Sequence, residues 1–262
     1  MIEVEGISKR FGSVKAVDQL SLKVEPGQIV GLLGPNGAGK TTTMRIMCGI
    51  SPPDSGAIRI NGIALADEPV AAKAQLAFVP AEPRLFDYLT VAEHIAFFAK
   101  LYAAAQDESE GVGERTERFL HHGTRLIEQL ELADRADFLP GALSRGMKQK
   151  LMFACALVHE PNVLVFDEPF TGLDPHAIRK VRLILQEHIQ KGAAIIISSH
   201  LLGMVEDMVN HIIILNRGKK MVEGTMGDLR KKLASDQETA DLEEIFIQLT
   251  SQPPVSAVGE NA

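Results

Sequence analysis

The chain has 262 residues, of which 45 % are hydrophobic and 23 % are charged, as expected for a globular protein with one large α/β domain and a small appendage. Its two cysteines, Cys48 and Cys155, are far apart and form no C-x-x-C pair, which argues against a disulfide framework and a zinc site and fits a reducing compartment. The formal net charge of −7 argues against a nucleic-acid partner, because overall negative charge does not attract a phosphate backbone.

The N-terminal part of the sequence favours β-structure. It opens with MIEVEGISKR, which lacks the apolar core of a secretion signal. Residues 14–24 alternate in part between apolar and polar side chains, and residues 28–33 form a short apolar run. A helix is expected over residues 39–48, ended by Gly49. Residues 58–60 alternate again and predict a further strand.

The middle of the chain has a helical pattern from residue 90 to about residue 161. Thr90 is expected to be the N-cap, because Glu93 follows three residues later as in a capping box. Residues 106–123 are polar and charged, and we expect an exposed loop or a frayed helix there. No apolar run approaches the roughly 20 residues needed to cross a bilayer. If this protein acts at a membrane, another chain must therefore span the bilayer.

Three short apolar runs follow, at residues 163–166, 194–198 and 212–215. Continuous apolar runs are typical of parallel strands that are covered on both faces, and a helix expected over residues 177–191 separates the first two. This order predicts a parallel sheet with crossover helices, preceded by a β-rich part and interrupted by a helical insertion. After Gly218 we expect only a short tail.

Residues 34–41 read GPNGAGKT and match the phosphate-loop pattern G-x-x-x-x-G-K-[ST]. Glycines let backbone N–H groups turn toward phosphate oxygens, and the N-terminus of the following helix adds partial positive charge. Lys40 would neutralise the β- and γ-phosphates, and the Thr41 hydroxyl would bind Mg²⁺. A chance glycine-rich loop is the alternative, but the strand before and the helix after argue against it. The nucleotide-binding residues expected here are Gly34, Pro35, Asn36, Gly37, Ala38, Gly39, Lys40, Thr41 and Thr42.

Two carboxylates, Asp167 and Glu168, end the apolar run at residues 163–166. Binding sites in parallel α/β sheets form at the carboxyl ends of the strands. Asp167 suits the coordination shell of Mg²⁺, and Glu168 suits a base that polarises an attacking water. Acidic pairs are also common in solvated turns, so the catalytic interpretation depends on the phosphate loop upstream.

Three further motifs occur in the order found in a known family. They are LSRGMKQK at residues 143–150, TGLDP at residues 171–175 and ISSH at residues 197–200. Together with the phosphate loop and the acid pair, they resemble the ATP-binding subunits of ABC transporters over about residues 1–230. Residues 144–150 and 242–250 are similar to the exporter ATPases that pair with ABC-2-type or Ecs-type permeases.

The resemblance implies an α/β P-loop NTPase with a RecA-like parallel-sheet core, an N-terminal antiparallel β-subdomain and a helical insertion. The ATPase domain would cover residues 1–230, with the helical subdomain at about residues 90–160, and residues 231–262 would be a short extension with a disordered end. The resemblance also implies hydrolysis of ATP with Mg²⁺, a dimer with a second ATP-binding subunit, and a separate integral membrane permease. The chain would then lie peripherally at the cytoplasmic face of the cell membrane and would energise export.

The family pattern carries over to several binding residues. Phe11 stands where an aromatic ring stacks on adenine, and Val17 where a side chain supports the same ring; without the resemblance, Phe11 would be interpreted as a core residue. Ser144 and the backbone of Gly146 would bind the γ-phosphate of ATP held by the other subunit, although Ser144 also suits a simple helix N-cap. Asp174 would lie at the dimer seam or, alternatively, serve as an ordinary turn residue before a proline.

The resemblance also assigns a second catalytic residue beside Glu168. His200 would contact the γ-phosphate and hold the attacking water and Glu168 in place. A lone histidine at a strand end is more often structural, and its place within the ISSH motif reverses that expectation.

The sequence departs from the family in two places. The family's signature motif usually reads LSGGQ, and residues 143–147 stand in its place as LSRGM. Arg145 and Met147 thus replace a glycine and the glutamine, while Ser144 and Gly146, which bind phosphate in the family, remain. After residues 77–80, Ala81 replaces a glutamine that meets Mg²⁺ and water, and Glu82 follows it. Alanine cannot bind a metal, so either Glu82 or a water would fill that place.

Other functions fit parts of the pattern. One is a soluble ABC-type ATPase that acts in regulation or on the ribosome or DNA. The chain has one such domain rather than two, and it shows neither coiled-coil heptads nor paired cysteines, which argues against ribosomal and DNA-repair members. A nucleotide-binding regulator without turnover would fit Ala81, but Glu168 and His200 argue against it.

Overall fold

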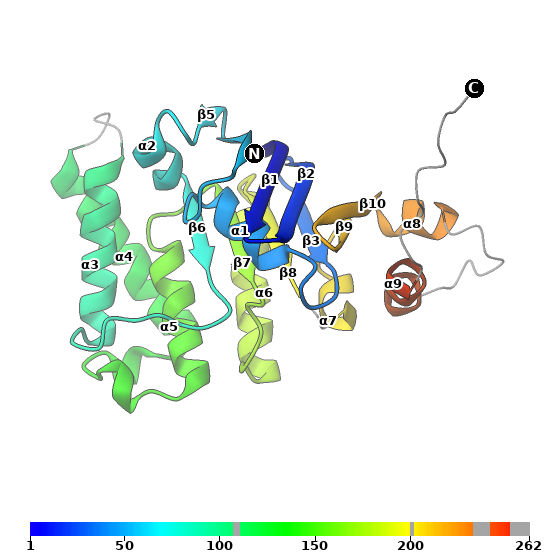
Figure 1. Cartoon of the computed structure of the whole chain (residues 1–262). Coiled ribbons are helices and arrows are strands. Elements are labelled where there is room, and N and C mark those ends of the chain that lie inside the picture. Colours follow the sequence, from blue (N-terminus) through cyan, green and yellow to red (C-terminus); the bar gives the residue numbers. More distant parts are fainter. Residues whose placement is uncertain (107–110, 200–201, 233–241, 252–262) are drawn as a thin grey trace, which may run out of the picture.

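The computed structural model describes residues 1–106, 111–199, 202–232 and 242–251. Its strands are β1 (Ile2–Phe11), β2 (Val14–Val24), β3 (Ile29–Leu33), β4 (Ser55–Ile60), β5 (Ile63–Ala64), β6 (Leu76–Val79), β7 (Val163–Asp167), β8 (Ala194–Ser198), β9 (His211–Asn216) and β10 (Lys219–Gly224). They form two sheets that lie on either side of one short helix (Figure 1).

The helices cover the larger sheet and extend beyond it on one side (Figure 1). They are α1 (Lys40–Met47), α2 (Pro69–Ala74), α3 (Val91–Ala105), α4 (Val112–Gln129), α5 (Arg145–Leu157), α6 (Pro175–Gln190), α7 (Leu202–Glu206), α8 (Met226–Lys232) and α9 (Leu242–Ser251). Two short 3₁₀ turns, Ala133–Arg135 and Pro140–Ala142, join α4 to α5.

The smaller sheet has the strand order β2-β1-β4-β5, and its neighbouring strands are antiparallel. Alternate residues of β1, including Ile2 and Val4, are buried, because one face of the sheet packs on the rest of the protein. The N-terminal part is therefore the antiparallel β-subdomain expected from the sequence.

The larger sheet has the order β10-β9-β3-β8-β7-β6, and its five strands from β9 to β6 are parallel. Every residue of β3, β7 and β8 is buried, because helices lie on one face and the smaller sheet with α1 on the other. Strand β8 lies between β3 and β7. The carboxyl ends of these three strands consequently meet at one edge, which receives both the phosphate loop and the acid pair.

Two clusters of buried apolar side chains hold these layers together. One lies between the two sheets and contains Met44, Ile46 and Met47 of α1. The other lies between the larger sheet and helices α3 to α9, and it contains Phe153 of α5 and Phe166 of β7 with ring centroids 5.4 Å apart. Because α1 is enclosed by two sheets, the end of the phosphate loop rests on a rigid element.

The helical insertion is built from α3, α4 and α5. At the start of α3, the Thr90 side chain accepts a hydrogen bond from the Glu93 amide (3.2 Å) and the Glu93 carboxylate accepts one from the Thr90 amide (2.8 Å). The predicted capping box is therefore confirmed.

Helix α4 corrects the expectation of a loop or frayed helix at residues 106–123. The segment is polar overall, but Arg115 and Phe119 occupy one face at i, i+4 spacing and are both buried. The Arg115 guanidinium donates to the carbonyl oxygens of Ala103 (2.6 Å) and Gln106 (3.0 Å) at the end of α3. A buried charge of this kind satisfies carbonyls that a helix C-terminus leaves without partners.

The chain after Gly218 also differs from the expected short tail. Strand β10 pairs antiparallel with β9 and extends the larger sheet. Helix α9 contacts α7 and α8, and its Leu242 is fully buried in the core. Disorder was expected over residues 251–262; Ser251 is the last residue of α9, and residues 252–262 lie outside the described residues.

A buried hydroxyl in α1 gives a stability prediction. Thr43 is 0 % exposed, and no described residue forms a hydrogen bond with its Oγ1. Because a buried polar group without a partner is destabilising, Thr43→Val should raise the free energy of unfolding by about 1 kcal/mol and the melting temperature by a few degrees, measured by thermal denaturation.

Thr116 of α4 provides the matched control. Its hydroxyl donates to the Val112 carbonyl (2.7 Å) on an exposed helix face, so Thr116→Val should give no gain. A Thr43→Val protein that melts at a lower temperature than the wild type would contradict the prediction.

Candidate nucleotide-binding and catalytic site

The phosphate loop joins the end of β3 to the start of α1. Its glycines adopt backbone conformations that other residues rarely adopt: φ is 80° at Gly37 and 101° at Gly39. A Cβ atom at Gly39 would lie 2.3 Å from the Ala16 carbonyl oxygen of β2. On the other side, the Gly218 amide donates to the Ala38 carbonyl (2.9 Å). Segments from both sheets therefore fix the shape of the loop.

Lys40, the first residue of α1, points its side chain back into the loop. The ammonium group donates to the carbonyl oxygens of Gly34 (2.6 Å) and Pro35 (3.3 Å). Burial lowers the pKa of Lys40, and the negative charges of Glu168 and Asp167 oppose that shift. A phosphate oxygen is a stronger partner for an ammonium group than a neutral carbonyl, so this arrangement suits an anionic ligand.

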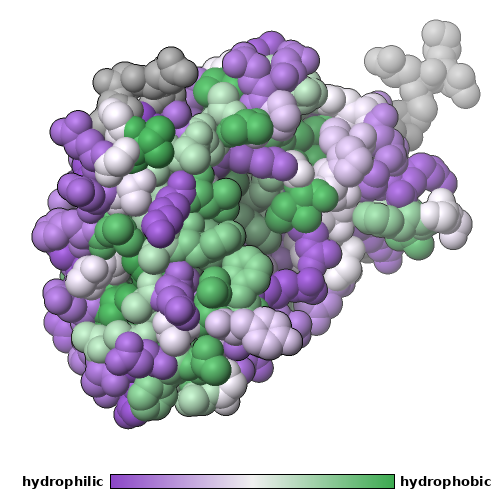
Figure 2. All heavy atoms as spheres, turned by 90° about the vertical axis from the view of Figure 1, so that its left-hand side faces the viewer, coloured by the Kyte–Doolittle hydropathy of each residue, from purple (hydrophilic) through white to green (hydrophobic). Residues whose placement is uncertain are grey.

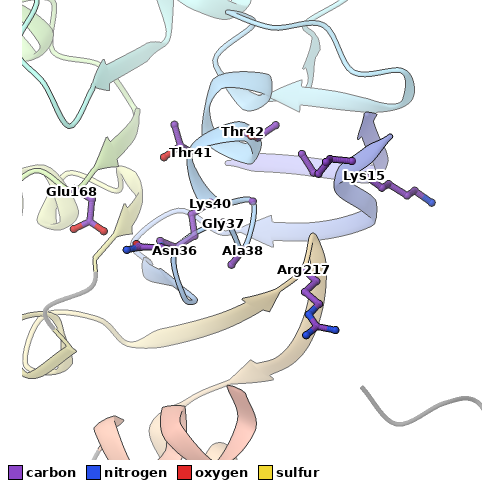
Figure 3. Close-up of a pocket in the computed structure, with 12 residues that line it drawn as sticks. Lys15, Asn36, Gly37, Ala38, Lys40, Thr41, Thr42, Glu168 and Arg217 are labelled. Atoms are coloured by element: carbon purple, nitrogen blue, oxygen red, sulfur yellow. The ribbon is translucent and has the colours of Figure 1, made fainter. Parts of the chain in front are cut away.

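A cavity of about 530 Å³ lies over the loop. Figure 3 shows the phosphate loop between Glu168 on one side and the β9–β10 turn that carries Arg217 on the other. The cavity is lined by Val14, Lys15, Ala16, Asn36, Gly37, Ala38, Gly39, Lys40, Thr41, Thr42, Glu168 and Arg217. The volume suits a small molecule, and the polar lining provides two more cations besides Lys40.

The acid pair lies where β7 ends. Asp167 is buried, and its Oδ1 accepts a hydrogen bond from the Ser198 hydroxyl of β8 (2.7 Å). Glu168 follows with φ of 49°, and its side chain lines the cavity. The structure thus brings Glu168 together with Lys40 and Thr41 at the cavity, while the neighbouring Asp167 is buried at the end of β7.

The two residues expected beside adenine behave differently. Phe11 ends β1 opposite Val14, which lines the cavity, and its ring is 56 % exposed. That exposure argues against the alternative that Phe11 is a core residue. Val17 is fully buried between the sheets and does not line the cavity, and its expected support of the adenine ring stays a prediction. Its neighbour Ala16 lines the cavity instead.

Ser144, Gly146 and Asp174 lie away from the cavity of their own chain, since none of them lines it. Ser144 caps α5 by accepting a hydrogen bond from the Met147 amide (3.2 Å). Asp174 caps α6 by accepting one from the Ala177 amide (2.8 Å), and this bond holds the pKa of Asp174 below its usual range. The expected helix-capping role of Ser144 is confirmed, Asp174 proves to be a helix cap rather than an ordinary turn residue, and the expected contacts of these residues with nucleotide stay predictions.

The remaining residues singled out from the sequence are His200, Ala81 and Glu82. His200 lies outside the described residues. Ala81 and Glu82 follow β6, Glu82 is exposed, and neither lines the cavity. Sequence reasoning missed Val14, Lys15, Ala16 and Arg217. Only Val14 to Ala16 could have been inferred, from their position just before the predicted adenine-supporting residue.

Comparison with known proteins settles the family. The sequence profile of the family described as "ABC transporter" matches residues 17–171, which is more than half of the chain. The chain belongs to the ABC transporter family. This membership confirms the predicted α/β P-loop NTPase fold and the predicted class of activity, that of an ABC transporter's ATP-hydrolysing subunit.

Individual relatives of this ABC transporter protein match nearly its whole length. EcsA of Bacillus subtilis (strain 168), an ABC-type transporter ATP-binding protein, is 32 % identical over 96 % of this chain and 97 % of its own. Nod factor export ATP-binding protein I of Paraburkholderia xenovorans (strain LB400) is 34 % identical over 94 % of this chain and 76 % of its own. A solved ATP-binding subunit of an ABC transporter has a TM-score of 0.85 and 34 % identity, covering 95 % of this chain and 99 % of that one.

Proposed function

We propose that two copies of this chain close around two MgATP molecules and, by hydrolysing them, drive export through a separate membrane permease. The observation that carries this proposal is the cavity, in which the phosphate loop with Lys40 faces the carboxylate of Glu168. The loop would hold the triphosphate, and the carboxylate would act on water at its end. Export is the favoured direction because the signature motif and the C-terminal helix are similar to exporter ATPases.

The residues available for a metal fit Mg²⁺. The Thr41 hydroxyl and the Asp167 carboxylate are oxygen donors, which Mg²⁺ prefers, and Mg²⁺ is usually held by one or two carboxylates together with phosphates and waters. The described part of the chain has no cluster of three or more His, Cys, Asp or Glu residues that could hold a metal by itself. When bound, Mg²⁺ would neutralise charge on the phosphates.

Glu168 is the proposed general base. Its carboxylate would accept a hydrogen bond from water and turn the water oxygen toward the γ-phosphorus. Lys40 would donate to phosphate oxygens, as it now donates to carbonyl oxygens of the loop. His200 is proposed to contact the γ-phosphate, as the family pattern implies.

A dimer would explain the placement of the signature motif. The first turn of α5 contains Arg145 and Lys148 and no acidic residue, although helix N-termini favour negative charge. An anion from another molecule would suit this end. The γ-phosphate bound by the partner would therefore meet Ser144 and Gly146, and Asp174 would lie nearby at the seam. Because hydrolysis removes that phosphate, the dimer would open afterwards.

The permease is proposed to dock on the helical side of the molecule. The segment before α3 and the face of α3 expose large apolar side chains: Phe86, Tyr88, Phe97 and Leu101. Tyr88 is 92 % exposed, and the Phe86 and Phe97 rings meet edge to face at 5.2 Å. Figure 2 shows apolar side chains gathered on this side of the molecule among hydrophilic ones. Contiguous exposed apolar surface of this kind marks an interaction site.

This chain would reach the membrane through that partner. None of the described helices is both long and apolar enough to pass through a bilayer. We therefore infer a peripheral position on the cytoplasmic side, where ATP is available.

Replacing two aromatic residues tests the docking surface. The variant Tyr88→Ser/Phe97→Ser should lose co-purification with a permease encoded in a neighbouring reading frame, because it removes exposed apolar area. Its ATPase activity without the permease should stay within about twofold of wild type, because neither residue lines the cavity.

The control for this experiment is Met221→Ser, since Met221 is 38 % exposed on β10, which lies on the side of the molecule opposite α3 (Figure 1). It should leave co-purification unchanged. Full retention of the permease by the aromatic double variant would contradict docking at this surface.

A further inference from the structure

A buried hydroxyl group at the end of β8 lies beside the strand that ends at the acid pair. Ser198 is the last residue of β8 and is 0 % exposed. In the register of the sheet it lies opposite Asp167 of β7 on one side and Leu32 of β3 on the other. A serine in the middle of five parallel strands requires hydrogen-bond partners, because a buried hydroxyl without them is destabilising.

Both partners of this hydroxyl belong to the acid pair. Ser198 Oγ donates to Asp167 Oδ1 at 2.7 Å and accepts from the Glu168 amide at 2.9 Å. A hydroxyl carries one proton and two acceptor lone pairs. Donation to the carboxylate therefore fixes the orientation of the hydroxyl, and a lone pair is left facing the Glu168 N–H.

The backbone of Glu168 needs a hydrogen bond that keeps it in this conformation. Its φ of 49° lies in the left-handed region, which is unfavourable by about 1–2 kcal/mol for a residue with a Cβ atom. A residue keeps this conformation only where its surroundings impose it. A return of the backbone to the extended region would swing the Glu168 side chain out of its present direction and away from the cavity.

We propose that Ser198 is a positioning residue that holds Glu168 in its catalytic direction. Asp167 orients the hydroxyl, and the hydroxyl fixes the amide of Glu168 and hence the direction of its carboxylate. Ser198 touches neither water nor nucleotide in this scheme. The inference rests on the proposed function, in which Glu168 acts on the attacking water.

The first experiment is Ser198→Ala, compared with Thr43→Val as a matched control. Both changes remove a hydroxyl that is 0 % exposed, but of the two only the Ser198 hydroxyl has hydrogen-bond partners among the described residues. Ser198→Ala should lower kcat about 10- to 100-fold, since a misplaced catalytic group can cost that much. The KM for ATP and the affinity for a fluorescent ATP analogue should change less than about threefold, because the phosphate loop is intact. Thr43→Val should keep the wild-type kcat.

Two further variants separate hydrogen bonding from packing. Ser198→Thr keeps the hydroxyl and should restore kcat to within about fivefold of wild type. Ser198→Cys keeps a similar volume with a much weaker hydrogen bond and should stay as slow as Ser198→Ala. If the role of Ser198 were only structural, the Ser198→Ala protein would melt at a lower temperature, but its kcat per folded molecule would equal that of the wild type. That result would overturn the proposal.

A double-mutant cycle checks that Ser198 acts through Glu168. In a Glu168→Gln background, Ser198→Ala should lower the remaining turnover less than about twofold. A full additional 10- to 100-fold loss would show that Ser198 acts elsewhere and would also overturn the proposal. These outcomes can be distinguished from failure of the proposed function. If the proposed function were wrong, the wild-type protein itself would show no ATP hydrolysis that depends on Lys40.

Discussion

Glu168→Gln is expected to lower ATP turnover at least about 100-fold while ATP still binds. Glutamine has nearly the shape of glutamate but cannot take a proton from water, and loss of a general base typically costs about 10²- to 10⁴-fold in rate. ATP binding should survive because the phosphate loop and Lys40 are untouched. Steady-state release of inorganic phosphate gives the rate, and titration with a fluorescent ATP analogue gives the affinity.

The same variant tests the proposed dimer. With the γ-phosphate retained, the closed state should persist, so size-exclusion chromatography with Mg²⁺ and ATP should show a dimer that disappears without nucleotide. Glu187→Gln is the control, since Glu187 is an exposed glutamate on α6, and it should hydrolyse ATP at the wild-type rate. Normal turnover by Glu168→Gln would remove Glu168 from the mechanism.

Lys40→Ala is expected to weaken ATP binding about 10- to 100-fold. The ammonium group lies inside the loop, bonded to the Gly34 and Pro35 carbonyls, where it can exchange these neutral partners for phosphate oxygens. Hydrogen bonds to charged groups contribute about 1.5–3 kcal/mol, which corresponds to that range of affinity. Equilibrium titration with a fluorescent ATP analogue measures the change.

Removal of a lysine elsewhere distinguishes this specific contact from a general loss of positive charge. Lys100 is exposed on α3 and does not line the cavity, so Lys100→Ala should bind ATP like the wild type. Unchanged nucleotide affinity in Lys40→Ala would be incompatible with phosphate binding at this loop.

The phosphate loop and the strands around it could be predicted from the sequence because each is encoded by neighbouring residues. The strand before Gly34 is wholly buried and therefore wholly apolar, and the glycines mark a turn that other residues cannot make. The acid pair could be placed beside the loop because the carboxyl ends of parallel strands share one edge. Each of these patterns can be recognised from neighbouring residues alone, without knowledge of the long-range contacts that complete the site.

Helix α4 and strand β10 could not be predicted in this way. Mean polarity concealed the buried face of α4, where Arg115 is stabilised by carbonyl groups of a different helix. Strand β10 is an edge strand, in which Lys219, Lys220 and Met221 are exposed, so its short sequence shows little alternation. In both cases the deciding contact comes from a part of the chain far from the local pattern.

Some residues of the candidate site also could not be predicted from the local sequence. Arg217 reaches the cavity from a turn that forms only when β9 pairs with β10. Ala16 lines the cavity while its neighbour Val17 is buried in the core, because successive side chains of a strand point to opposite faces. The bond from Ser198 to Asp167 depends on the register of two strands, which their sequences do not specify individually.

The contact of Gly39 with the Ala16 carbonyl oxygen has a consequence for thermodynamics. The phosphate loop cannot keep its conformation if the N-terminal sheet unfolds, because the loop is shaped against a strand of that sheet. Both sheets thus belong to one cooperative unit with respect to the ligand. By linkage, a nucleotide that binds only the folded loop also stabilises residues of the N-terminal sheet that it never touches. Damage to a part of that sheet that lies outside the cavity lining would therefore lower the apparent affinity without removing a contact with the nucleotide.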